Sequence, residues 1–123
     1  SSPSLMPELS LLENIKYFLF NDNINENIIS NVLNKYELES FKSDLVRDFS
    51  SGMVKRSEIA IADLKNPKVL CIDEPRVYLD ENGVDLLLNL ITKREKEGST
   101  SILSSQESIG AFTSIERSFN LDD

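Results

Sequence analysis

Residues 69–75 read Val-Leu-Cys-Ile-Asp-Glu-Pro, a short apolar run that ends in two acids and a proline. Such a run, bounded by turn-forming residues, is typical of a strand covered on both faces in a parallel sheet. Ligands of open α/β sheets bind beyond the carboxyl ends of the strands. Asp73 and Glu74 therefore indicate a ligand site, although a simple loop cap explains an isolated pair of this kind equally well.

The sequence after this run predicts a helix and a second strand. Asp80 can cap a helix over 81–97, and Gly98 can end it. The basic residues of its last turn, Arg94 among them, suit the negative end of the helix dipole. Residues 100–103 form the second predicted strand. A strand, a helix and a strand in this order predict a right-handed crossover with parallel pairing.

The first 66 residues are mostly helical in pattern. Ser10 and Glu13 have the spacing of a capping box at the start of one helix. Apolar residues at helical spacing predict a second helix over 25–36 and a third from Ser50 to about residue 65. Residues 37–49 are mixed in character, and we expect them to be irregular. Because the pattern changes after Pro67, we expect one unit over 1–66 and another over 67–123.

Composition excludes several classes of function. The chain has 123 residues, with 13 Lys and Arg against 21 Asp and Glu, so its formal charge is −8. This balance argues against nucleic-acid binding, which needs a basic face. The absence of histidine excludes a Ser-His-Asp triad and histidine metal ligands. A single cysteine, Cys71, cannot form an internal disulfide, and its apolar surroundings predict a buried, reduced thiol in a cytosolic protein.

The sequence shows no apolar stretch near the roughly 20 residues that a membrane-spanning helix needs. Its first residues have neither a basic region nor an apolar region, so we expect no signal peptide. They also lack an initiator methionine, which suggests an excised piece of a longer protein.

Ser50, Ser51 and Gly52 open the third predicted helix. Small residues at a helix start leave backbone N–H groups accessible, so a phosphate can approach the positive end of the dipole. Taken alone, an ordinary serine N-cap is the favoured interpretation of this triplet. Lys55 and Arg56, one turn further on, can assist an anion or be solvated.

Together these elements resemble the ATPase domain of ABC transporters, in order and spacing, over nearly the whole chain. Residues 49–53 are similar to the signature motif, and residues 69–74 to the Walker B strand. Leu79-Asp80 resembles the end of the D-loop, and residues 102–106 resemble the switch region. Upstream, residues 5–15 resemble a segment that follows the Q-loop.

The resemblance implies an α/β fold of the P-loop NTPase type, present only in part. It assigns residues 1–66 to the helical subdomain with its signature motif. Residues 67–123 correspond to the C-terminal part of the RecA-like nucleotide-binding core, with parallel strands in a βαβ unit.

The resemblance also implies site residues, with ATP and Mg²⁺ as cofactors of the complete domain. Glu74 corresponds to the catalytic base, and Gln106 to the switch residue that senses the γ-phosphate. Asp73 corresponds to the residue that organises Mg²⁺. The nucleotide-binding positions are Ser50, Ser51, Gly52 and Asp80.

By the same resemblance, the signature motif faces ATP held by a second ATP-binding domain in a head-to-tail dimer. The first helix and the chain before it face a coupling helix of a membrane permease subunit. The implied location is cytoplasmic, peripheral at the inner face of the cell membrane.

The chain departs from the family pattern at several points. No G-x-x-x-x-G-K-[ST] is present, so the phosphate-cradling Walker A loop is absent. The Q-loop glutamine falls before Ser1. Ser51 replaces the usual first glycine of the signature, and Val77 the D-loop serine. Gln106 stands in place of the switch histidine and cannot carry an imidazole proton.

Three hypotheses follow. The leading one is a fragment or truncated copy of an ABC transporter ATP-binding subunit, from a bacterial exporter, with no ATP hydrolysis by this chain alone. The alternative is a non-catalytic, partner-binding ABC-like subunit, which Val77 and Gln106 favour somewhat. A chromosome-maintenance or repair ATPase is the third, and it is disfavoured because no long coiled coil is visible and the charge is acidic.

Overall fold

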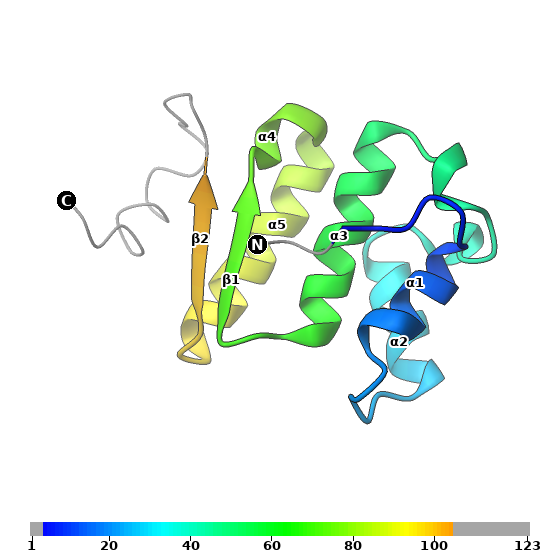
Figure 1. The fold of residues 1–123 in the computed structure, drawn as a ribbon. Coiled ribbons are helices and arrows are strands. Elements are labelled where there is room, and N and C mark those ends of the chain that lie inside the picture. The colour runs from blue at the N-terminus through cyan, green and yellow to red at the C-terminus, as the bar shows by residue number, and fades with distance from the viewer. Residues whose placement is uncertain (1–3, 105–123) are drawn as a thin grey trace. The chain divides into compact units, whose positions relative to one another are not determined.

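A computed structural model describes residues 4–104 of the chain (Figure 1). The chain divides into two compact units, with the boundary between Asn66 and Pro67. The first is helical. The second contains two strands and the helices that connect them.

The helical unit consists of α1 (Leu11–Phe18), α2 (Glu26–Lys35) and α3 (Ser51–Lys65), with two short 3₁₀ helices, η1 (Glu39–Phe41) and η2 (Val46–Asp48). Both α1 and α2 pack against α3. Their apolar stripes supply a core, because residues three and four apart share one helix face. Its buried apolar members are Leu11, Ile15, Leu19, Ile29, Leu33, Tyr36, Leu38, Val46, Ile59, Ala60, Ile61, Ala62 and Leu64.

The predicted helix starts are confirmed at atomic detail. The Glu13 amide donates to Ser10 Oγ at 3.0 Å, and the Ser10 amide donates to Glu13 Oε1 at 2.8 Å, which completes a capping box. Ser50 caps α3 by accepting from the Met53 amide at 3.1 Å. At the other end, Asn66 closes α3 in the left-handed conformation, with φ 46° and ψ 58°.

The segment between α2 and α3 is more ordered than its mixed sequence predicts. The Leu11 amide donates to the Asp44 carbonyl at 3.2 Å, and the Val46 amide donates to the Leu9 carbonyl at 3.0 Å. These bonds connect residues that are far apart in the sequence, so local periodicity does not predict the order of this segment.

The second unit runs β1 (Val69–Asp73), α4 (Pro75–Tyr78), α5 (Glu81–Lys96) and β2 (Thr100–Ser104). The two strands pair in parallel, with Val69 opposite Thr100 and Asp73 opposite Ser104. The predicted strand, helix and parallel strand are therefore confirmed. Leu87, Leu90 and Ile91 are buried on α5, which packs against β2.

Two predictions about β1 are wrong. Leu70 and Ile72 are buried, but Val69 is 55% exposed and Cys71 is only half-buried. Side chains alternate between the two faces of a strand, and among residues 4–104 only the face of β1 that carries Leu70 and Ile72 is covered. Cys71 lies on the other face, so its thiol is not the buried one expected.

Not every apolar residue of these helices is buried. Ile28 of α2 is 45% exposed, and Met53 of α3 is half-buried. Arg94 was expected to be a charge at the helix end, yet it is fully buried. Its Nε donates to Ser101 Oγ at 2.8 Å, so a partner on the following strand accounts for its position. The short helix α4 was not predicted.

Candidate functional site

The carboxyl end of β1 has an unusual backbone. Glu74 adopts φ 47° and ψ 50°, the left-handed region, which costs a residue with a Cβ roughly 1–2 kcal/mol. Its amide donates to the Ser104 carbonyl at 2.6 Å. The end of β2 therefore holds Glu74 in this conformation. Strained non-glycine residues that the surrounding structure fixes in this way cluster at functional sites.

The two acids differ in their surroundings. Asp73 is exposed, whereas Glu74 is half-buried and precedes α4, whose first residue is Pro75. The Glu74 side chain makes no capping hydrogen bond to α4.

Asp80 is the N-cap of α5. Its Oδ1 accepts a hydrogen bond from the Gly83 amide at 2.8 Å, and Asp80 is otherwise exposed. Gly83 leaves little room for a side chain here, because a Cβ would lie 2.9 Å from Leu79 Cδ2 and 3.1 Å from Asp80 Oδ1, so one of these side chains would have to shift. One Asp80 oxygen thus has a structural role, whatever else the residue contacts.

The start of α3 has the features of an anion site. Within residues 4–104, no acceptor is present for the Ser51 and Gly52 amides, as expected for the first turn of a helix. The first turn contains no acidic residue, and Ser50 and Ser51 are exposed. Open amides at the positive end of a 15-residue helix favour a phosphate or another anion.

The two basic residues one turn further on form ion pairs. Lys55 Nζ lies 3.2 Å from Glu58 Oε1, and Arg56 Nη1 lies 3.1 Å from Glu37 Oε1. Lys55 is also buried. A merely solvated Lys55 is therefore excluded, and both cations already face carboxylates of the helical unit.

A hollow of about 430 Å³ lies beside the start of α3. The rings of Phe41 and Phe49 meet edge to face there, 6.5 Å apart. Asp44 and Asp48 also line it, and both are exposed. Because these carboxylates repel an anion, the capacity to bind one belongs to the helix start and not to the hollow.

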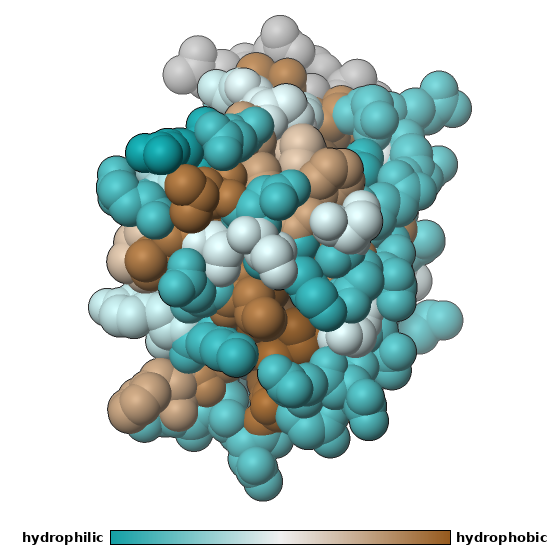
Figure 2. Space-filling model, turned by 90° about the vertical axis from the view of Figure 1, so that its right-hand side faces the viewer, coloured by the Kyte–Doolittle hydropathy of each residue, from teal (hydrophilic) through white to brown (hydrophobic). Residues whose placement is uncertain are grey.

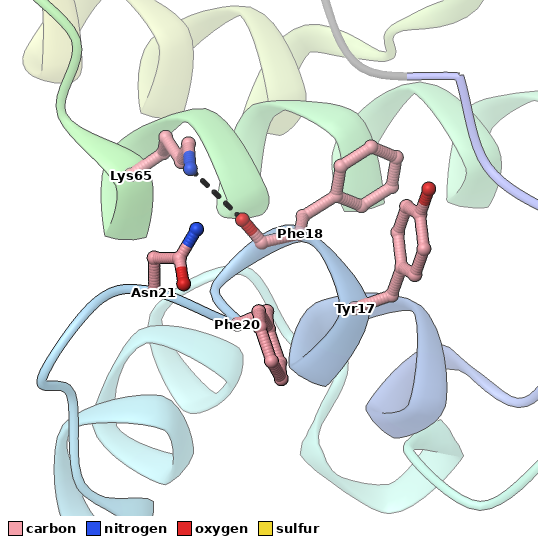
Figure 3. Close-up of a pocket in the computed structure, with 5 residues that line it drawn as sticks. All are labelled: Tyr17, Phe18, Phe20, Asn21 and Lys65. Carbon is pink, nitrogen blue, oxygen red and sulfur yellow. Dashed lines mark hydrogen bonds between the residues drawn. The ribbon is translucent and has the colours of Figure 1, made fainter.

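A second hollow, of about 580 Å³, follows α1 and is lined by aromatic residues (Figure 3). Tyr17 is 64% exposed and Phe20 is 83% exposed. Lys65 Nζ donates to the Phe18 carbonyl at 2.9 Å and lies 3.4 Å from an Asp22 oxygen. Figure 2 shows apolar side chains reaching the surface in patches on a largely hydrophilic face. Large exposed aromatic groups of this kind mark interaction surfaces.

A buried polar cluster joins α2 and α3. The Tyr36 hydroxyl donates to Asp63 Oδ2 at 2.9 Å, and Lys35 Nζ lies 2.7 Å from the same oxygen. Burial of the Tyr36 ring, and then the Asp63 charge, raise the pKa of the Tyr36 hydroxyl far above its ordinary value. This cluster holds α2 and α3 together. Its residues are far apart in the sequence, so no local pattern predicts the cluster.

The structure places the predicted site residues in two groups. Ser50, Ser51 and Gly52 lie at the start of α3 in the helical unit. The other group, in the α/β unit, has Asp73 and Glu74 at the end of β1 and Asp80 at the start of α5. Gln106 lies outside the described residues. Among residues 4–104, no cluster of three or more acidic, cysteine or histidine side chains forms a metal cage, and no helix is long and apolar enough to cross a membrane.

Comparison with known proteins places these features in a family. Residues 1–77 match the family model described as ABC transporter. The chain is 36% identical over 103 residues to the lantibiotic transport ATP-binding protein SrtF of Streptococcus pyogenes, a match that covers 84% of this chain and 45% of SrtF. The chain thus spans about half the length of the curated relatives it matches.

Solved structures agree with this result. A structure of the ATP-binding subunit of an ABC transporter matches 95% of this chain and 49% of its own, with a TM-score of 0.78 and 26% identity. An ATP-binding cassette solved as a dimer in a post-hydrolysis state with ADP and Pi matches 85% of this chain and 49% of its own, with a TM-score of 0.70 and 26% identity. The chain therefore belongs to the ABC transporter family and forms part of an ATP-binding domain.

Proposed function

We propose that this chain supplies the signature and Walker B parts of an ABC transporter ATP-binding subunit, which couples ATP binding and hydrolysis to transport by a bacterial exporter. The observation that supports it most strongly is the conformation of Glu74. Glu74 lies at the end of a strand, and a 2.6 Å hydrogen bond from its amide to the Ser104 carbonyl holds it in the left-handed region. Strained residues that are held in this way cluster at functional sites, so this conformation supports a functional role for Glu74.

Glu74 acts as the general base in this proposal. A carboxylate that orients or deprotonates an attacking water contributes about 10²–10⁴ to a rate. Gln106, in the switch position, hydrogen-bonds the γ-phosphate. Without the Walker A loop, the chain has no primary phosphate site, so it does not hydrolyse ATP alone.

The residues present fit the proposed cofactors. Mg²⁺ binds one or two carboxylates together with phosphate oxygens and waters, so the exposed Asp73 suffices on the protein side without a cage. When bound, the ion neutralises the phosphate charge. Asp80 belongs to the loop that couples the two nucleotide sites of a dimer, and its cap on α5 fixes where that loop ends.

The start of α3 contacts a nucleotide held by a second ATP-binding domain, in a head-to-tail dimer. Open amides at Ser51 and Gly52 and the Ser50 hydroxyl suit the γ-phosphate of ATP. The related cassette solved as a dimer with ADP and Pi supports this arrangement for the family.

The aromatic hollow at Tyr17, Phe18 and Phe20 faces a membrane permease subunit. The exposed aromatic rings of this hollow suit the binding of a partner's helix, which would bury its apolar face against them. In this arrangement the chain is cytoplasmic and peripheral at the inner face of the membrane. Lantibiotic transport by the relative SrtF supports an exporter of peptide-type cargo.

The test uses complete SrtF from S. pyogenes as the second ATP-binding domain. Adding the chain should raise the ATPase rate of SrtF, and Ser50→Arg should abolish the increase, because arginine fills the start of α3. Ser40→Arg is the matched control, since Ser40 is an exposed serine of the same unit. An equal increase with both variants contradicts a role for the α3 start.

A non-catalytic, partner-binding role is the second candidate. Val77, which is 61% exposed, stands where the family has its D-loop serine, and this favours it. In that case the chain binds SrtF without raising its ATPase rate.

A further inference from the structure

Asn14 is a buried polar residue on the apolar face of α1. Like its neighbours Leu11 and Ile15, it has no exposed surface. An amide can occupy such a position without a large penalty only where its polar atoms are hydrogen-bonded. The partners of Asn14 therefore show what the residue does.

The Asn14 side chain makes three hydrogen bonds to the chain that precedes α1. Its Oδ1 accepts from the Met6 amide at 2.7 Å, and its Nδ2 donates to the Met6 carbonyl at 3.1 Å. Nδ2 also donates to the Ser10 carbonyl at 2.9 Å. We call residues 6–10 the strap. An amide offers both an acceptor and donors to the strap, whereas an aspartate of the same size lacks the donors and a leucine lacks both.

The strap is bonded in turn to the segment that leads into α3. The Val46 amide donates to the Leu9 carbonyl at 3.0 Å. The Arg47 amide donates to the Pro7 carbonyl, also at 3.0 Å. We call residues 44–49 the α3 lead. Backbone hydrogen bonds to the strap therefore hold the α3 lead in place.

The α3 lead ends next to the residue that caps α3. The Phe49 amide donates to the Val46 carbonyl at 2.9 Å, and Ser50 follows directly. Ser50 Oγ accepts from the Met53 amide at 3.1 Å, which closes the first turn of α3. A series of hydrogen bonds thus runs from Asn14 through the strap and the α3 lead to this cap.

We propose that Asn14 is a positioning residue for the start of α3. By fixing the strap, it orders the α3 lead before an anion binds, so less ordering has to occur on binding. Asn14 is fully buried, so it acts through the strap and not by touching the ligand. The inference rests on the anion-binding role proposed for the start of α3, and it adds the residue that prepares this site.

Asn14→Ala removes all three side-chain bonds between α1 and the strap. The Leu11 amide still donates to the Asp44 carbonyl, so the α3 lead should loosen without unfolding. Binding at the start of α3 must then order this segment. Ordering the backbone of roughly one more residue weakens binding by about tenfold.

Amide hydrogen exchange tests the link without any ligand. In the wild-type chain, the amides of Met6, Val46 and Arg47 should open with a common free energy, because they belong to one bonded unit. Asn14→Ala should speed the exchange of all three by about tenfold or more. The Met53 amide, which reports on the cap of α3, should also exchange faster, by a smaller factor.

Two controls separate positioning from a general loss of stability. Asn31→Ala replaces an exposed asparagine of α2 and should leave these rates unchanged. Ile29→Ala removes a buried side chain of α2, so it should speed exchange across the helical unit and not selectively in the strap and the α3 lead. If Asn14→Ala has the exchange pattern of Ile29→Ala, its role is only structural and the proposal is overturned.

The wild-type chain decides the link even if Asn14→Ala does not fold. A common opening of the Met6, Val46 and Arg47 amides supports it. A Met6 amide that exchanges like that of an unfolded chain, while the other two stay protected, overturns it.

The ATPase rate of complete SrtF measures the effect on binding. Asn14→Ala should raise the concentration of the chain that gives half of the maximal increase by about tenfold. The maximal rate should stay within about twofold of the wild-type value, because Asn14 prepares the site and takes no part in the reaction. Asn31→Ala should match the wild type, and circular dichroism gives the folded fraction of each variant.

An unchanged half-maximal concentration for folded Asn14→Ala overturns the positioning role. If even the wild-type chain does not raise the SrtF rate, the proposed function fails. Exchange at the Met53 amide in Asn14→Ala then decides the positioning role by itself, so the two failures remain distinct.

Discussion

Arg94 and Ser101 form a buried hydrogen bond that joins a helix to the strand that follows it. Arg94 Nε donates to Ser101 Oγ at 2.8 Å, and Arg94 Nη2 donates to the Thr100 carbonyl at 2.7 Å. The guanidinium has several donors in a fixed plane, so it can bond a side chain and the backbone of β2 together. This residue fixes the register between α5 and β2.

Arg94→Ala should lower the free energy of unfolding by about 3 kcal/mol, because it removes the hydrogen bonds to Ser101 and Thr100 and leaves a cavity at a fully buried site. The stability of Arg94→Lys should lie between those of the wild type and Arg94→Ala, since one ammonium cannot satisfy both acceptors with the same geometry. Urea unfolding followed by circular dichroism measures the change. Lys96→Ala, an exposed residue in the same turn, should stay within about 0.5 kcal/mol of the wild type. Equal losses for Arg94→Ala and Lys96→Ala contradict a role for the buried contacts.

Ionisation of the Tyr36 hydroxyl should lower the stability of the protein at high pH. Its pKa is raised in the folded state by burial and by the Asp63 charge, so the folded protein holds the proton more tightly than the unfolded chain. The contribution is fully present below the ordinary tyrosine pKa, about 10, and is lost progressively as the pH rises above it. The free energy of unfolding should fall by up to about 1.4 kcal/mol per pH unit in that range from this group alone.

Tyr36→Phe should reduce this slope and lower stability near pH 7 by about 1 kcal/mol, through loss of the bond to Asp63. Urea midpoints measured from pH 7 to 11.5 test both effects. Tyr17→Phe is the control, because the Tyr17 side chain is 64% exposed. If both variants have the wild-type slope, Tyr36 does not cause it.

Glu74→Gln tests the proposed general base in a complete ATP-binding domain, made by joining this chain to the part of SrtF that lies outside the match between the two proteins. The amide cannot accept a proton from water, so ATP turnover should slow by about two orders of magnitude or more. ATP affinity should stay within about threefold, because the change is nearly isosteric. Steady-state turnover and nucleotide titration measure the two quantities. Unchanged turnover would falsify the role of Glu74.

The backbone of Glu74 gives a prediction that does not depend on activity. Glu74→Gly should stabilise the chain or leave it unchanged, because glycine adopts a left-handed conformation freely. Glu74→Val should be less stable than Glu74→Gly by at least about 1–2 kcal/mol, because valine has a Cβ and is β-branched. Thermal unfolding distinguishes the two. A lower stability for the glycine variant than for the valine variant contradicts the left-handed conformation.

Gly98 gives a second backbone test. It ends α5 with φ 82°, and a Cβ there has nothing within 4 Å, so any cost of Gly98→Ala comes from the backbone and not from a clash. The loss should be about 1 kcal/mol, and about half of that for Gly98→Asn, since asparagine tolerates this region better. Urea midpoints should therefore decrease from the wild-type glycine to the asparagine variant and then to the alanine variant. Equal stability of all three variants is the contrary result.

Local chemistry explains which parts of the fold the sequence predicts well. The Ser10 and Glu13 capping box, the Ser50 and Asp80 caps and the stop at Asn66 each depend on residues within four positions of one another. The parallel pair β1 and β2 follows from the order of the elements. These features need no knowledge of distant contacts.

The remaining features depend on distant partners. Arg94 has the pattern of an exposed helix end, and only Ser101 and Thr100 explain its burial. Val69 is exposed because, among residues 4–104, no element covers its face of the sheet, and no local pattern in the sequence contains that information. At the candidate site, the identity of Asp73 and Glu74 was apparent from the sequence. The left-handed backbone of Glu74 was not, because it is fixed by Ser104, 30 positions further along the chain.

The hydrogen bond between the Glu74 amide and the Ser104 carbonyl makes the acid mechanically dependent on the second strand. A displacement of the chain at Ser104 must either pull Glu74 with it or break this bond, which frees the peptide to leave its left-handed conformation. The position of the proposed base is therefore coupled to the main chain at Ser104, through a contact that involves neither its charge nor its carboxylate.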